Sequence, residues 1–128
     1  MSRLALVGFA VAVLLAVAGC GGQKTFSLGS TQECLMQKGA HIGGKLDFVA
    51  QTATGGAFIT KLDDNTVSVV FGQTVKDGQQ IELAYQRFAF SNVRAGLSDV
   101  LRRNANVVML WHEHPSDSDF QLVNGCLK

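Results

Sequence analysis

The clearest pattern of hydrophobic and polar positions in this chain is an alternation in two adjacent segments, 57–62 and 66–72. Both segments are rich in β-branched and aromatic residues, which favour strands. Asp64-Asn65 lies between them, and these residue types tolerate the positive φ of a tight turn. A two-residue turn at this position predicts three cross-strand pairs: Leu62 with Val67, Thr60 with Val69, and Phe58 with Phe71. We therefore expect a β-hairpin with one apolar face.

A helical periodicity follows the hairpin. Thr74 and Asp77 have the spacing of a capping box, in which the two residues satisfy each other's free backbone N–H groups. Beyond them, four apolar residues fall at i, i+3, i+4 and i+7: Ile81, Ala84, Tyr85 and Phe88. This spacing predicts an amphipathic helix whose apolar face, Phe88 included, packs on the core. We expect Gly96 to end or bend this helix before a short helical turn at 98–103.

A second capping box is predicted before the hairpin, at Ser30 and Glu33. The helix that it begins should run to about Lys38, where Gly39 provides a left-handed end. This helix turns Cys34 toward the core.

Four shorter patterns complete the set of expected elements. The segment 40–43 is short enough to be an edge strand, and 47–52 is expected to form a short helix. The segment 106–111 is almost entirely apolar, which predicts a strand covered on both faces. Ser116-Asp117-Ser118-Asp119 has the composition of a helix N-terminus, so a last helix is expected to run to Asn124.

Helices that accompany one hairpin and one later strand indicate the α+β class. We expect a small, mainly antiparallel sheet made of the hairpin 57–72 and the strand 106–111, with helices packed on one face. The length of the chain suits one such domain, which we place at 31–128.

The first twenty residues carry one basic residue, Arg3, followed by an uncharged run from Leu4 to Ala18. A basic segment before a short apolar core is typical of a secretory signal peptide. The run ends in Val17-Ala18-Gly19-Cys20, which resembles the lipobox of bacterial lipoproteins. That resemblance implies cleavage before Cys20 and a diacylglyceryl group on its thiol.

The lipobox also predicts a location. Residues 1–19 would be the signal peptide, and 20–30 the lipidated cysteine with a flexible tether rich in glycine and serine. The lipid would hold the mature protein on the extracytoplasmic face of the cell membrane or the outer membrane, so the membrane is the expected partner. An uncleaved transmembrane helix and a plain secretory signal are the alternatives.

The charge balance excludes one class of partner. The chain has eleven basic and ten acidic residues, and Arg3 belongs to the predicted signal peptide, which leaves ten against ten. A net charge near zero gives no reason to expect nucleic acid. A net charge near zero is compatible with an unidentified partner in the cell envelope.

Two cysteines follow the predicted lipidation site, namely Cys34 and Cys126. An even pair in an exported domain predicts a disulfide, and a bridge enclosing about 90 residues would stabilise the fold by roughly 4–5 kcal/mol. A redox or metal-binding thiol pair is the alternative. The placement of Cys34-Leu35 and Cys126-Leu127 is also similar to small exported bacterial domains of unknown activity, which implies a disulfide-closed α+β domain.

The segment His112-Glu113-His114-Pro115-Ser116 contains the best candidate metal ligands. Two histidines at i and i+2 on extended backbone, His112 and His114, point the same way and can bind one metal ion, with Asp117 or Asp119 as a further ligand. The segment resembles the His-x-His-Pro-Ser core of the JAMM zinc metalloproteases, which implies a zinc site. That family continues with a Ser-x-x-Asp segment, and 120–128 contains neither residue type.

Motifs for other chemistries do not occur, because the sequence has no Gly-x-Ser-x-Gly elbow, P-loop or Gly-x-Gly-x-x-Gly pattern. We therefore expect a membrane-anchored binding or structural module of the cell envelope that is not an enzyme and needs no cofactor. The alternative hypothesis is a metal-binding or metal-dependent protein that uses His112 and His114.

Overall fold

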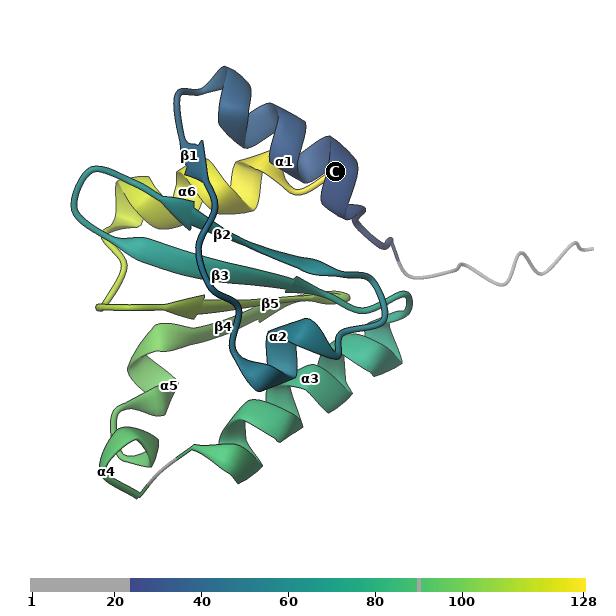
Figure 1. The fold of residues 1–128 in the computed structure, drawn as a ribbon, viewed down its shortest axis with the longest axis vertical. Coiled ribbons are helices and arrows are strands. Elements are labelled where there is room, and N and C mark those ends of the chain that lie inside the picture. Colours follow the sequence, from purple (N-terminus) through teal and green to yellow (C-terminus); the bar gives the residue numbers. More distant parts are fainter. Residues whose placement is uncertain (1–23, 90) are drawn as a thin grey trace, which may run out of the picture.

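A five-stranded antiparallel sheet lies between two layers of helices in the computed structural model, which describes residues 24–89 and 91–128 (Figure 1). The strand order is β1-β2-β3-β5-β4. The strands are β1 (His41–Ile42), β2 (Ala57–Lys61), β3 (Thr66–Phe71), β4 (Leu101–Asn104) and β5 (Val107–Trp111). The α+β class and the antiparallel sheet are thus confirmed. The predicted signal peptide and Cys20 lie outside the described residues.

The helices cover both faces of the sheet, so the prediction that they pack on one face is wrong. One layer holds α1 (Leu28–Gln37) and α6 (Asp117–Cys126). The other holds α2 (Phe48–Gln51), α3 (Val75–Phe88), α4 (Ser91–Arg94) and α5 (Leu97–Val100). The reason is that successive residues of the central strand β5, namely Val107, Val108 and Met109, are all apolar and all 0 % exposed. A strand without a polar face needs cover on both sides, which confirms the expectation for this strand.

The hairpin of β2 and β3 is confirmed, but its turn lies one residue earlier than predicted, at Asp63-Asp64. The N–H of Leu62 donates to the carbonyl of Asn65 over 2.8 Å and closes this turn. The observed pairs are Thr60 with Val67, Phe58 with Val69 and Ala57 with Val70. The predicted register was therefore wrong by two residues, a shift that leaves the same side chains on the same face.

The side chain of Asn65 explains the position of the turn. Its Oδ1 accepts hydrogen bonds from the N–H groups of Thr66 and Glu113, at 2.9 and 3.1 Å. Its Nδ2 donates to the carbonyl of Glu113 over 2.9 Å. Asn65 thus extends the pairing of β3 with the segment after β5 and is buried there, so it does not serve as a turn residue.

The helix α3 and its capping box are confirmed, with Thr74 as the N-cap and Asp77 as the reciprocal partner. The segment after it differs from the prediction. The expected helical turn at 98–103 ends with α5, and Leu101–Asn104 forms the edge strand β4 instead. These four residues pair with β5, whose edge would otherwise stay unpaired. Ala105, at a positive φ of 52°, makes the tight connection between the two strands.

The folded domain begins at Phe26, earlier than the predicted boundary at residue 31. The amide of Asn106 is buried and binds the main chain of Phe26 twice, because it accepts from the N–H and donates to the carbonyl, each over 2.8 Å. The next residue, Ser27, is the N-cap of α1, and its N–H donates to the carbonyl of Lys128 over 2.6 Å. The capping box predicted at Ser30 and Glu33 is therefore wrong, because both residues lie inside the helix. The segment that was expected to be a tether therefore partly belongs to the domain.

The last helix and the disulfide are confirmed. The hydroxyl of Ser116 caps α6 by accepting from the N–H of Asp119 over 3.1 Å. This helix continues through Gly125 to Cys126, two residues beyond its predicted end. Cys126 is bonded to Cys34 of α1, and their Cα atoms lie 5.5 Å apart. All described core residues lie between Phe26 and Leu127, so this segment has a complete core of its own.

Candidate functional site

An apolar groove opens between the helices of the second layer, and we call it the α2–α3 groove. Its volume is about 400 Å³, which falls within the range of small-molecule pockets, roughly 300–1,000 Å³. The sheet contributes one side chain, from β5, and helices α2, α3, α4 and α5 contribute the others. The lining residues are Asp47, Phe48, Val49, Tyr85, Phe88, Ala89, Val93, Leu97 and Leu110.

Two phenylalanines form the exposed rim of this groove. Phe48 is 70 % exposed and Phe88 is 62 % exposed, and their rings meet edge to face with centroids 6.5 Å apart. The prediction that Phe88 packs on the core is therefore wrong. Phe88 lies in the last turn of α3, where its aromatic neighbour belongs to the four-residue helix α2, which is too short to cover it. Large apolar side chains gathered at an open surface are typical of binding sites.

One polar contact lies inside the apolar lining. The hydroxyl of Tyr85 donates to the carboxylate of Asp47, at 2.9 Å from Oδ2 and 3.1 Å from Oδ1. The same carboxylate caps α2, because Oδ1 accepts from the N–H of Ala50 over 2.9 Å. Burial, assisted by the nearby charge of Asp47, raises the pKa of the Tyr85 hydroxyl above its ordinary value. Tyr85 therefore stays a neutral donor, and it holds the carboxylate in a fixed position.

The α2–α3 groove carries a single charge among its described lining residues, that of Asp47. The ion pairs found in the described part of the chain are Arg103 with Glu82 and His114 with Asp99, and neither involves this carboxylate. Asp47 is also exposed to solvent. The groove can thus accept a hydrogen bond or a positive charge at one place and offers apolar contact elsewhere.

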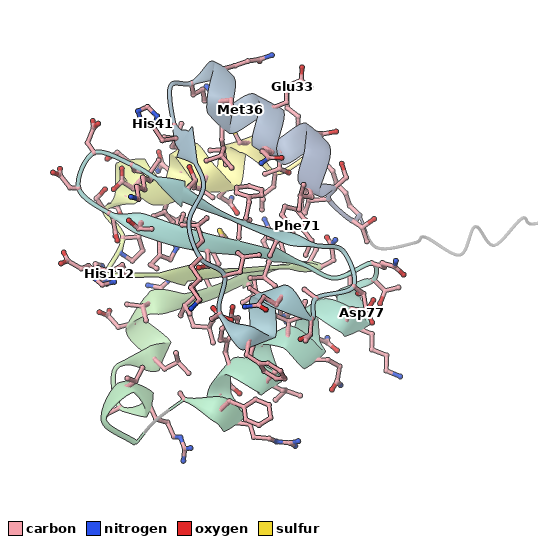
Figure 2. All side chains as sticks on the ribbon, in the orientation of Figure 1. Glu33, Met36, His41, Phe71, Asp77 and His112 are labelled. Carbon is pink, nitrogen blue, oxygen red and sulfur yellow. A yellow bond between two sulfur atoms is a disulfide. The ribbon has the colours of Figure 1, made fainter. Side chains whose placement is uncertain are left out.

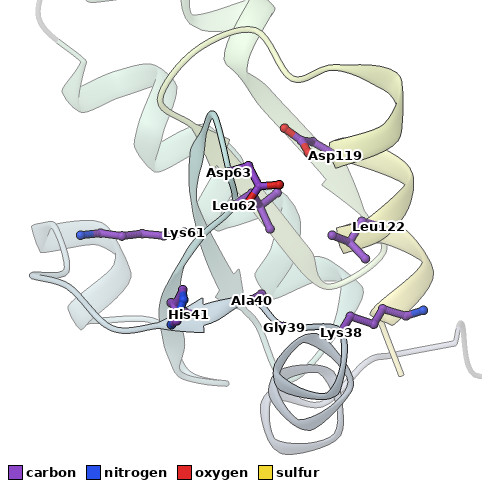
Figure 3. A pocket seen from close by; sticks show the side chains of 9 residues that line it. All are labelled: Lys38, Gly39, Ala40, His41, Lys61, Leu62, Asp63, Asp119 and Leu122. Atoms are coloured by element: carbon purple, nitrogen blue, oxygen red, sulfur yellow. The ribbon is translucent and has the colours of Figure 1, made fainter.

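A smaller cavity of about 180 Å³ lies on the other side of the sheet, between α1, α6 and the start of the hairpin turn (Figure 3). It mixes charges of both signs, because Lys38, Lys61, Asp63 and Asp119 all contribute to its lining. In Figure 3, the side chain of Lys61 points away from Leu62, an apolar residue of the lining. This cavity has neither the volume nor the aromatic lining of the α2–α3 groove.

The predicted metal ligands do not come together in a metal site. His112 continues β5, and its N–H donates to the carbonyl of Thr66 over 2.8 Å. His114 instead pairs with Asp99 of α5, over 2.6 Å between Nδ1 and Oδ1. In Figure 2, His41 lies apart from His112. Across residues 24–89 and 91–128, no three His, Cys, Asp or Glu side chains are arranged to hold a metal ion.

Comparison of this chain with protein-family models, with curated proteins and with solved structures gives no match. The helices that the structure describes are all too short or too polar to cross a membrane.

Proposed function

We propose that this protein is an extracytoplasmic lipoprotein, anchored through Cys20, whose domain binds a small and mainly apolar ligand in the α2–α3 groove. The observation that carries the proposal is the exposed aromatic rim around a groove of about 400 Å³. Ligand pockets are usually apolar with a few fixed polar groups, and the pair of Asp47 and Tyr85 is such a group.

A purely structural role explains this surface less well. Exposing Phe48 and Phe88 to water is unfavourable by about 25 cal/mol for each Å² of apolar surface. The opposite layer of the same domain shows that its helices can bury their inward apolar side chains completely, because Leu35 and Val123 are 0 % exposed there. An open aromatic rim is therefore better explained by a ligand that covers it.

The membrane anchor is supported by the sequence Val17-Ala18-Gly19-Cys20. Five residues separate Cys20 from Phe26, where the folded domain begins. An extended chain of this length spans at most roughly 20 Å. A lipid on Cys20 would therefore keep the domain close to the membrane surface.

Binding is tested with residues 21–128 and Nile red, a neutral apolar dye whose fluorescence rises in apolar surroundings. The double change Phe48→Ser and Phe88→Ser should weaken dye binding about tenfold, because most of the apolar rim is lost. Leu83→Ser is the matched control, since Leu83 is a 51 % exposed apolar residue of α3 outside the groove. Equal dye binding by the double variant and the wild type would contradict the proposed site.

The anchor is tested in a bacterial host with Cys20→Ser. Because acylation precedes cleavage in this class of proteins, the variant should remain an uncleaved precursor without a lipid. Partition into the detergent phase and intact mass measure both properties. A variant that matures at the same site, with a mass that differs from wild type only by the exchange of sulfur for oxygen, would remove the lipoprotein assignment and leave the binding site standing.

A further inference from the structure

We propose that the ligand of the α2–α3 groove is an organic ammonium ion whose apolar body lies along Phe48 and Phe88. This inference rests on the proposed function, because it names the chemical class of ligand for the same groove. It depends on three features of the lining: its aromatic rings, its single negative charge and its size.

Three of the described residues that line the groove are aromatic, namely Phe48, Tyr85 and Phe88. The faces of aromatic rings attract ammonium cations, and several rings around one pocket are a recurring way of binding quaternary ammonium groups. The edge-to-face arrangement of the Phe48 and Phe88 rings, at 85° between their planes, turns ring faces in two directions. A ligand in the groove can therefore contact one ring face with a cationic group and the other with an apolar chain.

The charge of the lining selects the sign of the ligand. Asp47 is held from two sides, by the hydroxyl of Tyr85 and by the N–H of Ala50. A carboxylate has about four acceptor positions, so Asp47 keeps capacity for another donor. The ammonium group of a ligand can donate a hydrogen bond to the remaining acceptor position of Asp47. A fatty acid would instead bring a second negative charge beside that of Asp47.

Basic side chains do not compensate this charge inside the groove, as far as the structure describes its lining. Arg94, which follows Val93 in α4, donates to the carbonyls of Arg87 and Ala89, at 3.5 and 3.1 Å. Its side chain lines a neighbouring cavity together with Glu82. The α2–α3 groove thus complements a cation, and its volume of about 400 Å³ limits the ligand to a small molecule.

Octylammonium, octanol and octanoate test the inference, because they share one apolar chain and differ in the charge of the head group. Each is titrated against residues 21–128 loaded with Nile red, and the displacement of the dye is measured. Octylammonium should bind about threefold to fivefold more tightly than octanol, as expected for a solvent-exposed charge pair, and octanoate should bind least.

The outcomes separate the two proposals. If octanol displaces the dye as effectively as octylammonium, the ammonium inference is wrong. The apolar binding site would stand in that case. Tighter binding of octanoate than of octanol would overturn it too. Failure of all three compounds to displace the dye would contradict the proposed function itself.

Asp47→Asn removes the charge and preserves the fold, because Asn is as good an N-cap as Asp. It should weaken octylammonium about threefold to fivefold more than it weakens octanol. Asp64→Asn is the matched control, since it removes the same charge from the exposed hairpin turn. If Asp47→Asn binds octylammonium as tightly as the wild type does, the carboxylate does not contribute to binding and the inference is wrong.

A second variant protects the test against a folding defect at Asp47. Phe88→Leu keeps an apolar side chain at the rim and removes the aromatic face. It should weaken octylammonium about threefold relative to octanol, because the cation–π contact is lost. An unchanged ratio of the two affinities would contradict the aromatic part of the inference.

Discussion

The two faces of the sheet are covered by helices in different ways. On one face, α1 and α6, of ten residues each, pack together and are joined by the Cys34–Cys126 disulfide. On the other face, the fourteen-residue helix α3 shares the cover with three helices of four residues each. The first arrangement buries Leu35 and Val123 completely and exposes Met36 on α1. The second leaves two neighbouring rings, those of Phe48 and Phe88, exposed at the rim of a groove.

This difference shows how one small sheet can provide both stability and a binding surface. Two helices of similar length that lie side by side close one face, and a covalent bond holds them together. Single-turn helices cannot cover the end of a longer helix, so a groove remains between them. The predictions below test whether the closed face carries most of the stability and the open face most of the binding.

The largest effect is expected on the closed face, from the removal of the disulfide. Changing both Cys34 and Cys126 to Ala should lower the free energy of unfolding by about 4 kcal/mol, because the bond closes a loop between residues 92 positions apart. Urea unfolding followed by the fluorescence of Trp111, the single tryptophan, measures it. The ends of the chain should lose protection from hydrogen exchange first, since helices of about ten residues are marginal without tertiary support.

Wild-type stability of the double variant would show that α1 and α6 hold together without the bond. Thiol counting on the unfolded, unreduced native protein is the control. Two free thiols there would mean that the bond does not form in the host.

A pair of matched substitutions compares the two faces directly. Phe71, which is 1 % exposed, packs against Phe58 on the closed face with ring centroids 5.9 Å apart. Phe71→Ala should cost about 3–5 kcal/mol of unfolding free energy, as expected for a buried aromatic side chain. Phe88→Ala on the open face should cost less than about 1 kcal/mol, yet it should weaken ligand binding. Equal losses of stability would contradict the distinction between the faces.

Gly78 lies where α3 passes close to the connection between β4 and β5. A Cβ at Gly78 would lie 2.6 Å from the carbonyl oxygen of Ala105 and 2.8 Å from the Cα of Asn106. Gly78→Ala should therefore cost about 1–3 kcal/mol, despite the better helix propensity of alanine, and should loosen the open face. Gly29→Ala in α1 is the control, because nothing lies within 4 Å of its Cβ position, and this variant should be neutral or slightly stabilising. Thermal unfolding measures both.

The elements that were predicted correctly are those whose signals are local. The alternation in β2 and β3, the capping box of Thr74 and Asp77 and the N-cap Ser116 each involve residues a few positions apart, and each works in isolation. The disulfide was also predictable, because two of the three cysteines follow the predicted lipidation site at Cys20, and two cysteines allow one pairing.

The features that were missed depend on partners far apart in the sequence. The register of the hairpin follows from Asn65 binding Glu113, forty-eight positions away. The strand β4 exists because β5 offers it an edge, and the start of the domain at Phe26 follows from a contact with Asn106, eighty positions away. A propensity for helix or turn at these positions is overridden by such contacts.

The α2–α3 groove was missed for a related reason. The amphipathic stripe predicted that Tyr85 and Phe88 face the core together, and only Tyr85 does. A short helix at 47–52 was expected, but the sequence does not reveal that this helix packs beside the last turn of α3 and leaves it open. A short predicted helix beside a long aromatic stripe is the one signal that could have indicated a gap.

The smallest effect concerns the hydrogen bond between Tyr85 and Asp47 in the α2–α3 groove. Burial, and then the charge of Asp47, raises the pKa of Tyr85, so the folded state keeps the phenol protonated where the unfolded chain ionises, near pH 10. The stability from this group is therefore fully present below about pH 10 and is lost as the pH rises beyond that value. Since Tyr85 is the single tyrosine, the ultraviolet absorbance of tyrosinate follows it directly. Tyr85→Phe should remove the loss of stability at high pH, whereas a native protein in which Tyr85 ionises near pH 10 would show that the contact with Asp47 does not persist in solution.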